Sequence, residues 1–272
     1  MFLAWKCGIK IRINHSHMAE KPEGLKNKIY YGLRLYFGKL FSTDYFACGR
    51  DAGIYLFGKK SVDSGKVIIL PNAIDYGRFK YDVEKREDIR NKNNVNESTV
   101  VIGHVGRFFK QKNHEFLIDI FNEILKKSDK YKLLLIGSGP LEEKIREKIK
   151  TYGIEKNIIM KKNITNVNEY MHASDLFVLP SLYEGLPVVG VEAQCADLPC
   201  IFSNEVTEEA KILETTNFLS IDNKEIWIEE ILKQKNKERK SRISEMIEKG
   251  YKIEEATIKL EKIYNDLVNL EE

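Results

Sequence analysis

Short apolar runs alternate with amphipathic stretches along the whole chain of 272 residues. The runs have the length of buried strands, and the stretches between them have the period of helices. Strands are predicted at 9–13, 45–48, 67–70, 100–105, 132–136, 158–160, 176–179 and 200–202, and helices at 113–125, 140–152, 188–195 and 224–234. This alternation is typical of α/β folds with parallel sheets.

The stretch 81–98 is the most polar connector in the chain and contains Lys-Arg-Glu-Asp and Asn-Lys-Asn-Asn. It is predicted to link a first domain (1–80) to a second domain (99–255), with one amphipathic turn allowed inside it. After residue 255, apolar residues fall on one helical face, at Ala256, Leu260, Ile263, Leu267 and Leu270. The segment 256–272 is therefore predicted to be a helix that packs back on the first domain.

Composition narrows the class of protein. Hydrophobic residues make up 43% of the chain, yet no apolar run approaches the roughly 18 residues of a membrane-spanning helix. The four cysteines lack any Cys-x-x-Cys pair, which favours reduced thiols in a cytoplasmic protein. Residues 1–60 hold eleven Lys and Arg against four Asp and Glu, which indicates an acidic partner, either an anionic membrane surface or a phosphorylated substrate. No nucleic-acid-binding motif accompanies this charge.

The segment 179–194 carries the most informative pattern. A buried strand ends at Leu179, Glu184 and Gly185 lie in a loop, and Pro187 suits the start of a helix whose first N–H groups, at Val188 and Val189, form an anion site. Glu192 follows one turn later, and two carboxylates beside such a site suit a phosphorylated ligand rich in hydroxyls. The same spacing also fits an ordinary strand–turn–helix connection with solvated glutamates.

The segment 101–114 runs from a buried strand into Gly106 and then through Arg107, Lys110 and Lys112. Cations at the carboxyl end of a strand in an open α/β sheet lie where ligands bind, although any single one of them is as often solvated. Gly137-Ser-Gly139 resembles a phosphate loop but has Glu142 in place of the third glycine, which leaves a dinucleotide dehydrogenase a poor second choice. The chain contains no Asp-x-Asp triplet, so no metal–diphosphate site is predicted.

Two features of the first domain also bear on function. His15 and His17 end a short predicted strand, and a histidine in such a place is more often structural than functional. The segment 26–41 mixes Lys26, Lys28, Arg34 and Lys39 with five aromatic residues. That mixture suits an anionic membrane interface, and it equally suits a core-packing helix with solvated lysines.

Together these motifs resemble glycosyltransferase family 4, whose GT-B fold has two Rossmann-like α/β domains. Glu184-x7-Glu192 is similar to the family's E-x7-E signature, and Gly106-Arg107 through Lys112-Asn113 is similar to its G-R…K-N segment. Pro71-Asn-Ala-Ile-Asp75 resembles its P-N-G-I-D turn. The run Arg12-Ile-Asn-His-Ser-His17 resembles the subgroup that builds bacterial capsules and exopolysaccharides.

The resemblance implies a role for each matching residue. Glu192 would hold the ribose hydroxyls of a nucleotide diphosphate sugar, and Glu184 would face the donor sugar near its reacting carbon. Arg107 and Lys112 would stabilise the leaving diphosphate without a metal or other cofactor, and His15, with His17 as the fallback, would lie near the transferred sugar. Further donor contacts would come from Gly106, Gly185, Leu186 and Val188. The reaction implied is retaining hexosyl transfer, with a UDP-sugar as the expected donor and a glycan or lipid-linked saccharide as acceptor, at the inner face of the plasma membrane.

Three departures from the family pattern qualify this picture. Ala73 replaces the glycine of the turn, and Asp197 replaces a glycine after the signature helix, where a left-handed backbone would relieve the strain. Family members also begin with roughly a hundred residues that this chain lacks, so the N-terminal Rossmann-like domain is expected to be incomplete, with uncovered sheet edges. The alternative function is a nucleotide-sugar-binding fragment without turnover. A GT-B epimerase or phosphorylase is a third reading, against which the E-x7-E signature argues.

Overall fold

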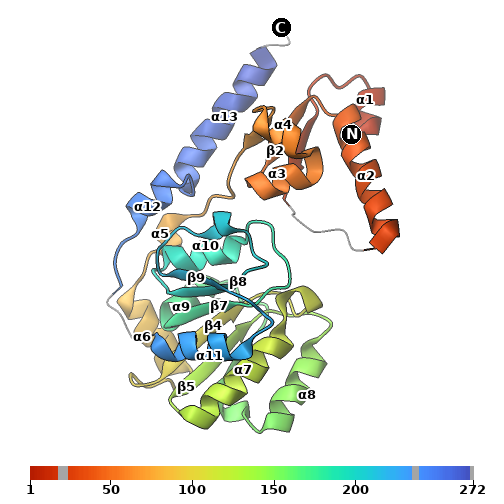
Figure 1. Cartoon of the computed structure of the whole chain (residues 1–272). Helices are drawn as coiled ribbons and strands as arrows, with labels where there is room; N and C mark the ends of the chain where they lie inside the picture. Colours follow the sequence, from red (N-terminus) through yellow and green to blue (C-terminus); the bar gives the residue numbers. More distant parts are fainter. Residues whose placement is uncertain (18–23, 235–238, 270–272) are drawn as a thin grey trace. The chain divides into compact units, whose positions relative to one another are not determined.

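The computed structural model describes residues 1–17, 24–234 and 239–269 (Figure 1). By its contacts the chain forms two compact units. The first unit comprises Met1–Ile74, Tyr183–Leu186 and Ile247–Glu272, and the second comprises Asp75–Leu182 and Pro187–Met246. No helix in the described part of the chain is both long and apolar enough to cross a membrane.

The first unit is built on a parallel sheet of three strands in the order β1-β2-β3. Its strands are β1 (Ile13–Ser16), β2 (Asp44–Ala47) and β3 (Val67–Ile69), and its helices are α1 (Phe2–Lys6), α2 (Gly24–Leu40), α3 (Arg50–Phe57), α4 (Lys59–Asp63) and α13 (Ile253–Asn269). Phe46 of β2 is fully buried and stacks on Tyr264 of α13 at 6.3 Å between ring centroids. The C-terminal helix thereby contacts the sheet of this unit, although none of its described residues is buried.

The prediction of a strand at 9–13 is wrong for all but its last residue, because β1 begins at Ile13. The chain joins the sheet only at Ile13, which pairs with Asp44 of β2. Just before Ile13, the guanidinium of Arg12 donates hydrogen bonds to backbone carbonyls, among them one from Nε to Phe41 O at 2.7 Å. The N–H of Arg12 donates to the hydroxyl of Thr43 rather than to a neighbouring strand.

The second unit is a parallel sheet of six strands in the order β6-β5-β4-β7-β8-β9. The strands are β4 (Val100–Val105), β5 (Tyr131–Ile136), β6 (Ile158–Lys161), β7 (Leu176–Leu179), β8 (Cys200–Ser203) and β9 (Thr216–Leu219). Numbered from its own first strand, this is the order 3-2-1-4-5-6 of the doubly wound nucleotide-binding fold. The strand order reverses between β4 and β7, and ligands of such sheets bind at the carboxyl ends of the strands at that point.

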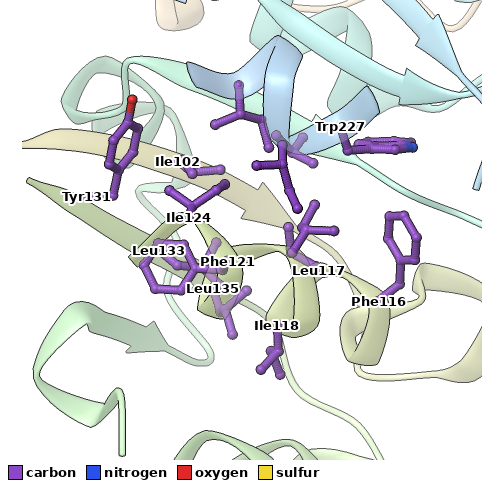
Figure 2. Close-up of a cluster of buried hydrophobic side chains, with 14 of the residues drawn as sticks. Ile102, Phe116, Leu117, Ile118, Phe121, Ile124, Tyr131, Leu133, Leu135 and Trp227 are labelled. Carbon is purple, nitrogen blue, oxygen red and sulfur yellow. The ribbon is translucent and has the colours of Figure 1, made fainter. Parts of the chain in front are cut away.

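Helices cover both faces of this sheet. The helices of this unit are α5 (Tyr76–Phe79), α6 (Val83–Lys92), α7 (His114–Lys127), α8 (Glu142–Tyr152), α9 (Val167–Ala173), α10 (Val188–Cys195) and α11 (Lys224–Lys233), with short 3-10 turns at Lys110–Lys112, Glu155–Asn157 and Glu208–Ala210. Helix α12 (Ile243–Glu248) has residues assigned to both units. Ile102 of β4 packs with α7, α8 and α11 in the cluster that Figure 2 shows, while its neighbour Val101 points to the opposite face, into a cluster with α6 and α9. Alternate residues of one strand therefore serve two hydrophobic layers.

The segment 81–98, predicted to be a connector, contains α6, which packs on α9. Two arginines of α6 reach the carboxylate of Asp175: Arg86 Nη2 lies 2.5 Å from Oδ1, and Arg90 Nη1 lies 3.1 Å from Oδ2. Their guanidinium groups also donate to carbonyls at the C-terminal end of α9, including that of Ala173. Positive charge at that helix end is favourable because the last carbonyls carry the negative end of the helix dipole.

The two substituted glycine positions are both accommodated. The backbone of Asp197 is left-handed, with φ 52°, as the sequence required. Its carboxylate accepts from Arg242 Nε at 2.7 Å and from the N–H of Lys240 at 2.5 Å, contacts that a glycine could not make. Among the non-glycine residues that the structure describes, Ala73 is not one of those with positive φ, so it needs no special conformation.

Candidate functional site

The candidate site of the second unit lies where the sheet order reverses, at the carboxyl ends of β4 and β7. These strands pair directly, through Ile102 with Leu176 and Gly103 with Phe177. The loops that follow them are also joined, because the N–H of Leu182 donates to Gln111 O at 2.8 Å. The cationic loop after β4 and the segment leading to α10 therefore meet at one edge of the sheet.

The loop after β4 holds the two side chains that are predicted to bind phosphate, and their surroundings differ. Arg107 is exposed and its guanidinium lies 4.3 Å from the ring centroid of Phe109. Lys112 is half-buried, and its side-chain carbons lie so close to Gly106 that a Cβ added there would be 3.0 Å from Lys112 Cγ and Cδ. Phe108, fully buried between them, anchors the loop to the core.

The Gly137-Ser-Gly139 loop packs against the backbone of the cationic loop. A Cβ at Gly137 would lie 2.0 Å from Gly106 O, and one at Gly139 would lie 2.6 Å from Phe108 O. The two loops also exchange hydrogen bonds, from Phe108 N to Ser138 O at 2.9 Å and from Leu141 N to Phe108 O at 3.1 Å. These glycines thus allow two backbones to touch, a function that their weak match to a phosphate loop did not predict.

Helix α10 begins at Val188, with Pro187 as its N-cap and no capping side chain. The N–H groups of Gly190 and Val191 donate to Pro187 O, whereas those of Val188 and Val189 precede the first intrahelical acceptor. Val188 is exposed, so this helix end offers backbone donors and a partial positive charge to an anion.

Glu192 lies one turn along α10 and is half-buried. Burial raises the pKa of this carboxyl to about 7, and the positive charge of Arg78 on α5 lowers it, opposing the burial effect. Near neutral pH, Glu192 is therefore divided between its protonated and carboxylate forms. Sequence reasoning did not identify Arg78, because its effect on Glu192 depends on the packing of α5 on α10, two helices that are far apart in the sequence.

The other predicted site residues belong to the first unit. Glu184, Gly185 and Leu186 are grouped there by their contacts, although along the chain they precede α10. His15 lies in β1 and is exposed as a whole residue, but its ring is partly enclosed by a cavity wall and lies 4.1 Å from that of His17. Burial of its ring and then the charge of His17 lower the pKa of His15 to about 4, so that it is neutral at pH 7.

His15 also lines an open cavity of about 590 Å³ in the first unit. Apolar side chains form most of its wall, with Arg34 and Asn14 as the other polar contributors. A cavity of this kind, apolar with a few polar groups, has the general character of a small-molecule site.

Two buried histidines behind the cationic loop were not predicted. His104 Nδ1 donates to Val178 O at 2.8 Å, and its ring meets that of His114 edge to face at 4.7 Å. Burial lowers the pKa of His104 to about 4 and that of His114 to about 2. Both are therefore neutral and serve as packing beneath the loop.

The sequence profile described as "Glycosyl transferases group 1" matches residues 85–252, more than half of the chain. The chain belongs to this family. It is 36% identical over 205 residues to the "Putative glycosyltransferase EpsF" of Bacillus subtilis, a match that covers 74% of this chain and 53% of the relative. It is 29% identical over 168 residues to the "Capsular polysaccharide biosynthesis glycosyltransferase CapM" of Staphylococcus aureus, covering 60% of this chain and 44% of the relative.

Solved structures give the same classification of the fold. The crystal structure of Anabaena Alr3699/HepE in complex with UDP-glucose matches with a TM-score of 0.78 at 15% identity, over 97% of this chain and 74% of that one. The expected GT-B class, with Rossmann-like units and parallel sheets, is thereby confirmed. The chain spans about half the length of the curated relatives that it matches in sequence.

Proposed function

We propose that this chain binds a nucleotide diphosphate sugar, with UDP as the nucleotide, and that it takes part in retaining glycosyl transfer of the family 4 type. The observation that carries the proposal is a hydrogen bond at the switch point of the second sheet, between the cationic loop, which holds Arg107 and Lys112, and the segment that leads to the open N-terminus of α10. Two cations and a helix end suit a diphosphate, and Glu192 beside them suits the hydroxyls of a ribose. UDP-glucose in the HepE structure supports the choice of nucleotide.

In the proposed reaction, a hexose or N-acetylhexosamine leaves the diphosphate for an acceptor hydroxyl. Negative charge grows on the diphosphate as the glycosidic bond breaks, and Lys112, Arg107 and the amides of Val188 and Val189 would stabilise it. These groups supply the positive charge that Mg²⁺ provides elsewhere, so we propose metal-independent transfer that needs no cofactor. Glu184 and His15 are assigned to the sugar by their positions in the family motifs, with His15 acting as a neutral hydrogen-bonding group.

The proposed acceptor is a glycan or lipid-linked saccharide in capsule or exopolysaccharide synthesis. Relatives named for capsular polysaccharide biosynthesis and for a diphosphoundecaprenol-linked substrate support this assignment. We therefore place the protein in the cytoplasm, at the inner face of the plasma membrane.

Helix α2 would provide the membrane contact. None of its residues is buried, and its exposed apolar side chains include Leu25, Ile29, Tyr30, Leu33, Tyr36, Phe37 and Leu40. Basic residues of the same helix, among them Lys26 and Arg34, would attract anionic lipid. Sedimentation with vesicles should give binding that needs anionic lipid and weakens with salt. A Tyr36→Ser, Phe37→Ser variant should bind less, and equal recovery with neutral vesicles would argue against this contact.

The second candidate function is nucleotide-sugar binding without turnover. The groups proposed to bind the diphosphate all belong to the second unit, whereas transfer also needs the residues assigned to the sugar, which belong to the first. Positioning an acceptor against the donor can contribute on the order of 7–11 kcal/mol of barrier lowering. A transfer assay with UDP-sugars and a lipid-linked acceptor separates the two candidates. We expect donor binding with little or no turnover by the 272-residue chain, and multiple turnovers at ordinary enzymatic rates would exclude the fragment alternative.

A further inference from the structure

Helix α10 begins without the side-chain hydrogen bond that fixes the start of many helices. Such a bond usually comes from a serine, threonine, aspartate or asparagine at the N-cap. Here the N-cap is Pro187, which makes no side-chain hydrogen bond. Other contacts must therefore set the position of the first turn, which holds the N–H groups of Val188 and Val189.

One of these contacts is a close approach of the first turn to strand β8. A Cβ added at Gly190 would lie 2.9 Å from Cζ of Phe202, a fully buried ring of β8. Gly190 therefore allows the turn to lie directly on the sheet, where a larger residue would push it away. An apolar contact has no preferred direction, so it limits the distance of the turn from the sheet but not its orientation.

A buried amide supplies a directional contact. Gln194 of α10 is fully buried, and its Nε2 donates to two carbonyls, Gly190 O at 3.0 Å and Ala210 O at 2.7 Å. Gly190 belongs to the first turn of α10, whereas Ala210 ends the 3-10 turn in the connection between β8 and β9. The amide thus bridges the start of the helix to a separate segment of the chain.

The oxygen of the same amide is also fully engaged. Gln194 Oε1 accepts from the N–H of Ile212 at 2.8 Å, from the N–H of Leu213 at 2.9 Å and from the hydroxyl of Thr216 at 2.8 Å. Three donors face the oxygen and two carbonyls face the nitrogen, so a flipped amide would lose all five bonds. The side chain of Gln194 is therefore held in one orientation.

The connection between β8 and β9 is also tied to the chain that precedes α10. The hydroxyl of Ser203, at the end of β8, donates to Ser181 O, and both serines are fully buried. Ser181 precedes the segment 182–187 in the sequence, and Gln194 follows it. The connection therefore holds the chain before and after the segment that leads into α10.

We propose that Gln194 is a positioning residue for the diphosphate of the donor. By bridging Gly190 O and Ala210 O, its amide fixes the first turn of α10. The N–H groups of Val188 and Val189 then keep one direction towards the anion. This inference rests on the proposed function, because that function assigns these two N–H groups to the diphosphate.

Calorimetric titration with UDP and with uridine at pH 8.5 separates this role from a purely structural one. In Gln194→Met the side chain keeps its straight form but bridges nothing, so UDP should bind about 10-fold more weakly, the equivalent of one hydrogen bond. Uridine lacks the diphosphate, and its affinity should change by less than about twofold. The ratio of the two affinities is the quantity to compare.

Gln194→Glu provides a second variant if the methionine variant does not fold. The three donors around Oε1 favour the carboxylate form of the new side chain. A carboxylate keeps these bonds but cannot donate to Gly190 O or Ala210 O, so it removes the bridge alone. The same selective loss of UDP affinity is expected.

Asp175→Asn controls for a loss of stability alone. It breaks the ion pairs with Arg86 and Arg90 just before β7, at the end of the strand opposite the start of α10. This variant should lower the temperature of thermal unfolding and leave the ratio of UDP to uridine affinity unchanged. If the Gln194 variants gave the same result, their effect would be structural only and the inference would be overturned. If the unmodified protein bound no UDP, the proposed function would fail and the inference with it.

Discussion

Replacing Asp175 by asparagine is expected to cost about 3–5 kcal/mol of the free energy of unfolding of the second unit. The side chain of Asp175 is 8% exposed, and its two arginine partners are 17% (Arg86) and 6% (Arg90) exposed. Asparagine keeps the shape and can still accept from the N–H of Val101, which now donates to Oδ2 at 2.8 Å. It cannot balance two buried guanidinium charges, and these would remain in a poorly hydrated site.

Asp88→Asn supplies the matched control for this loss. Asp88 forms an ion pair with Lys92 on the same helix α6, at 2.6 Å, but both side chains are more than half exposed. Surface pairs of this kind contribute about 0–1 kcal/mol. Urea unfolding followed through Trp227, which is fully buried in the second unit, reports on that unit if Trp5 is first changed to phenylalanine. Equal destabilisation by both substitutions would contradict the assignment.

Replacing Lys112 by methionine should weaken UDP binding about 10-fold to 100-fold, the usual range for one charge-assisted hydrogen bond. Methionine preserves the straight carbon chain that packs against Gly106, so the loop should keep its shape. The loss should therefore come from the missing charge on the diphosphate. Uridine, which has no phosphate, should bind both proteins equally.

Lys110→Met makes the same change of charge two residues away. Lys110 is exposed and, like Lys112, lies in the 3-10 turn of the cationic loop. Because only Lys112 lies against Gly106 at the strand end, we expect Lys110→Met to change UDP affinity by less than about threefold. Comparable losses in the two variants would mean that general charge, and not a placed ligand, attracts the nucleotide.

The sequence predicted those elements whose hydrophobic signal is local. Strands β4 and β7 have the predicted bounds because each is a short buried run followed by glycine or proline, and helix α10 has them because Pro187 marks its start. Strand β9, Thr216–Leu219, was not predicted, since its two polar residues give no apolar run and its pairing with β8 decides its conformation. The strand predicted at 9–13 begins only at Ile13 for a related reason. The hydrogen bonds of Arg12 and the pairing with β2 determine where the strand starts, and neither is visible in the local sequence.

The candidate site was predictable only in part. Gly106, Lys112 and Glu192 could be selected because their motifs are contiguous. The role of Gly137 depends on its contact with the backbone of Gly106, and the effect of Arg78 on the pKa of Glu192 depends on the packing of α5 on α10. Neither contact leaves a periodic signal in the sequence, since each joins segments at least thirty residues apart.

The central claim is that the second unit of this chain binds a nucleoside diphosphate through the groups at the switch point of its sheet. Calorimetric titration of the 272-residue protein with UDP, at pH 8.5 where Glu192 is largely a carboxylate, tests this most directly. We predict saturable binding at a single site, stronger for UDP than for uridine. Failure of UDP, ADP and GDP alike to saturate the protein, or equal binding of UDP and uridine, would contradict the claim.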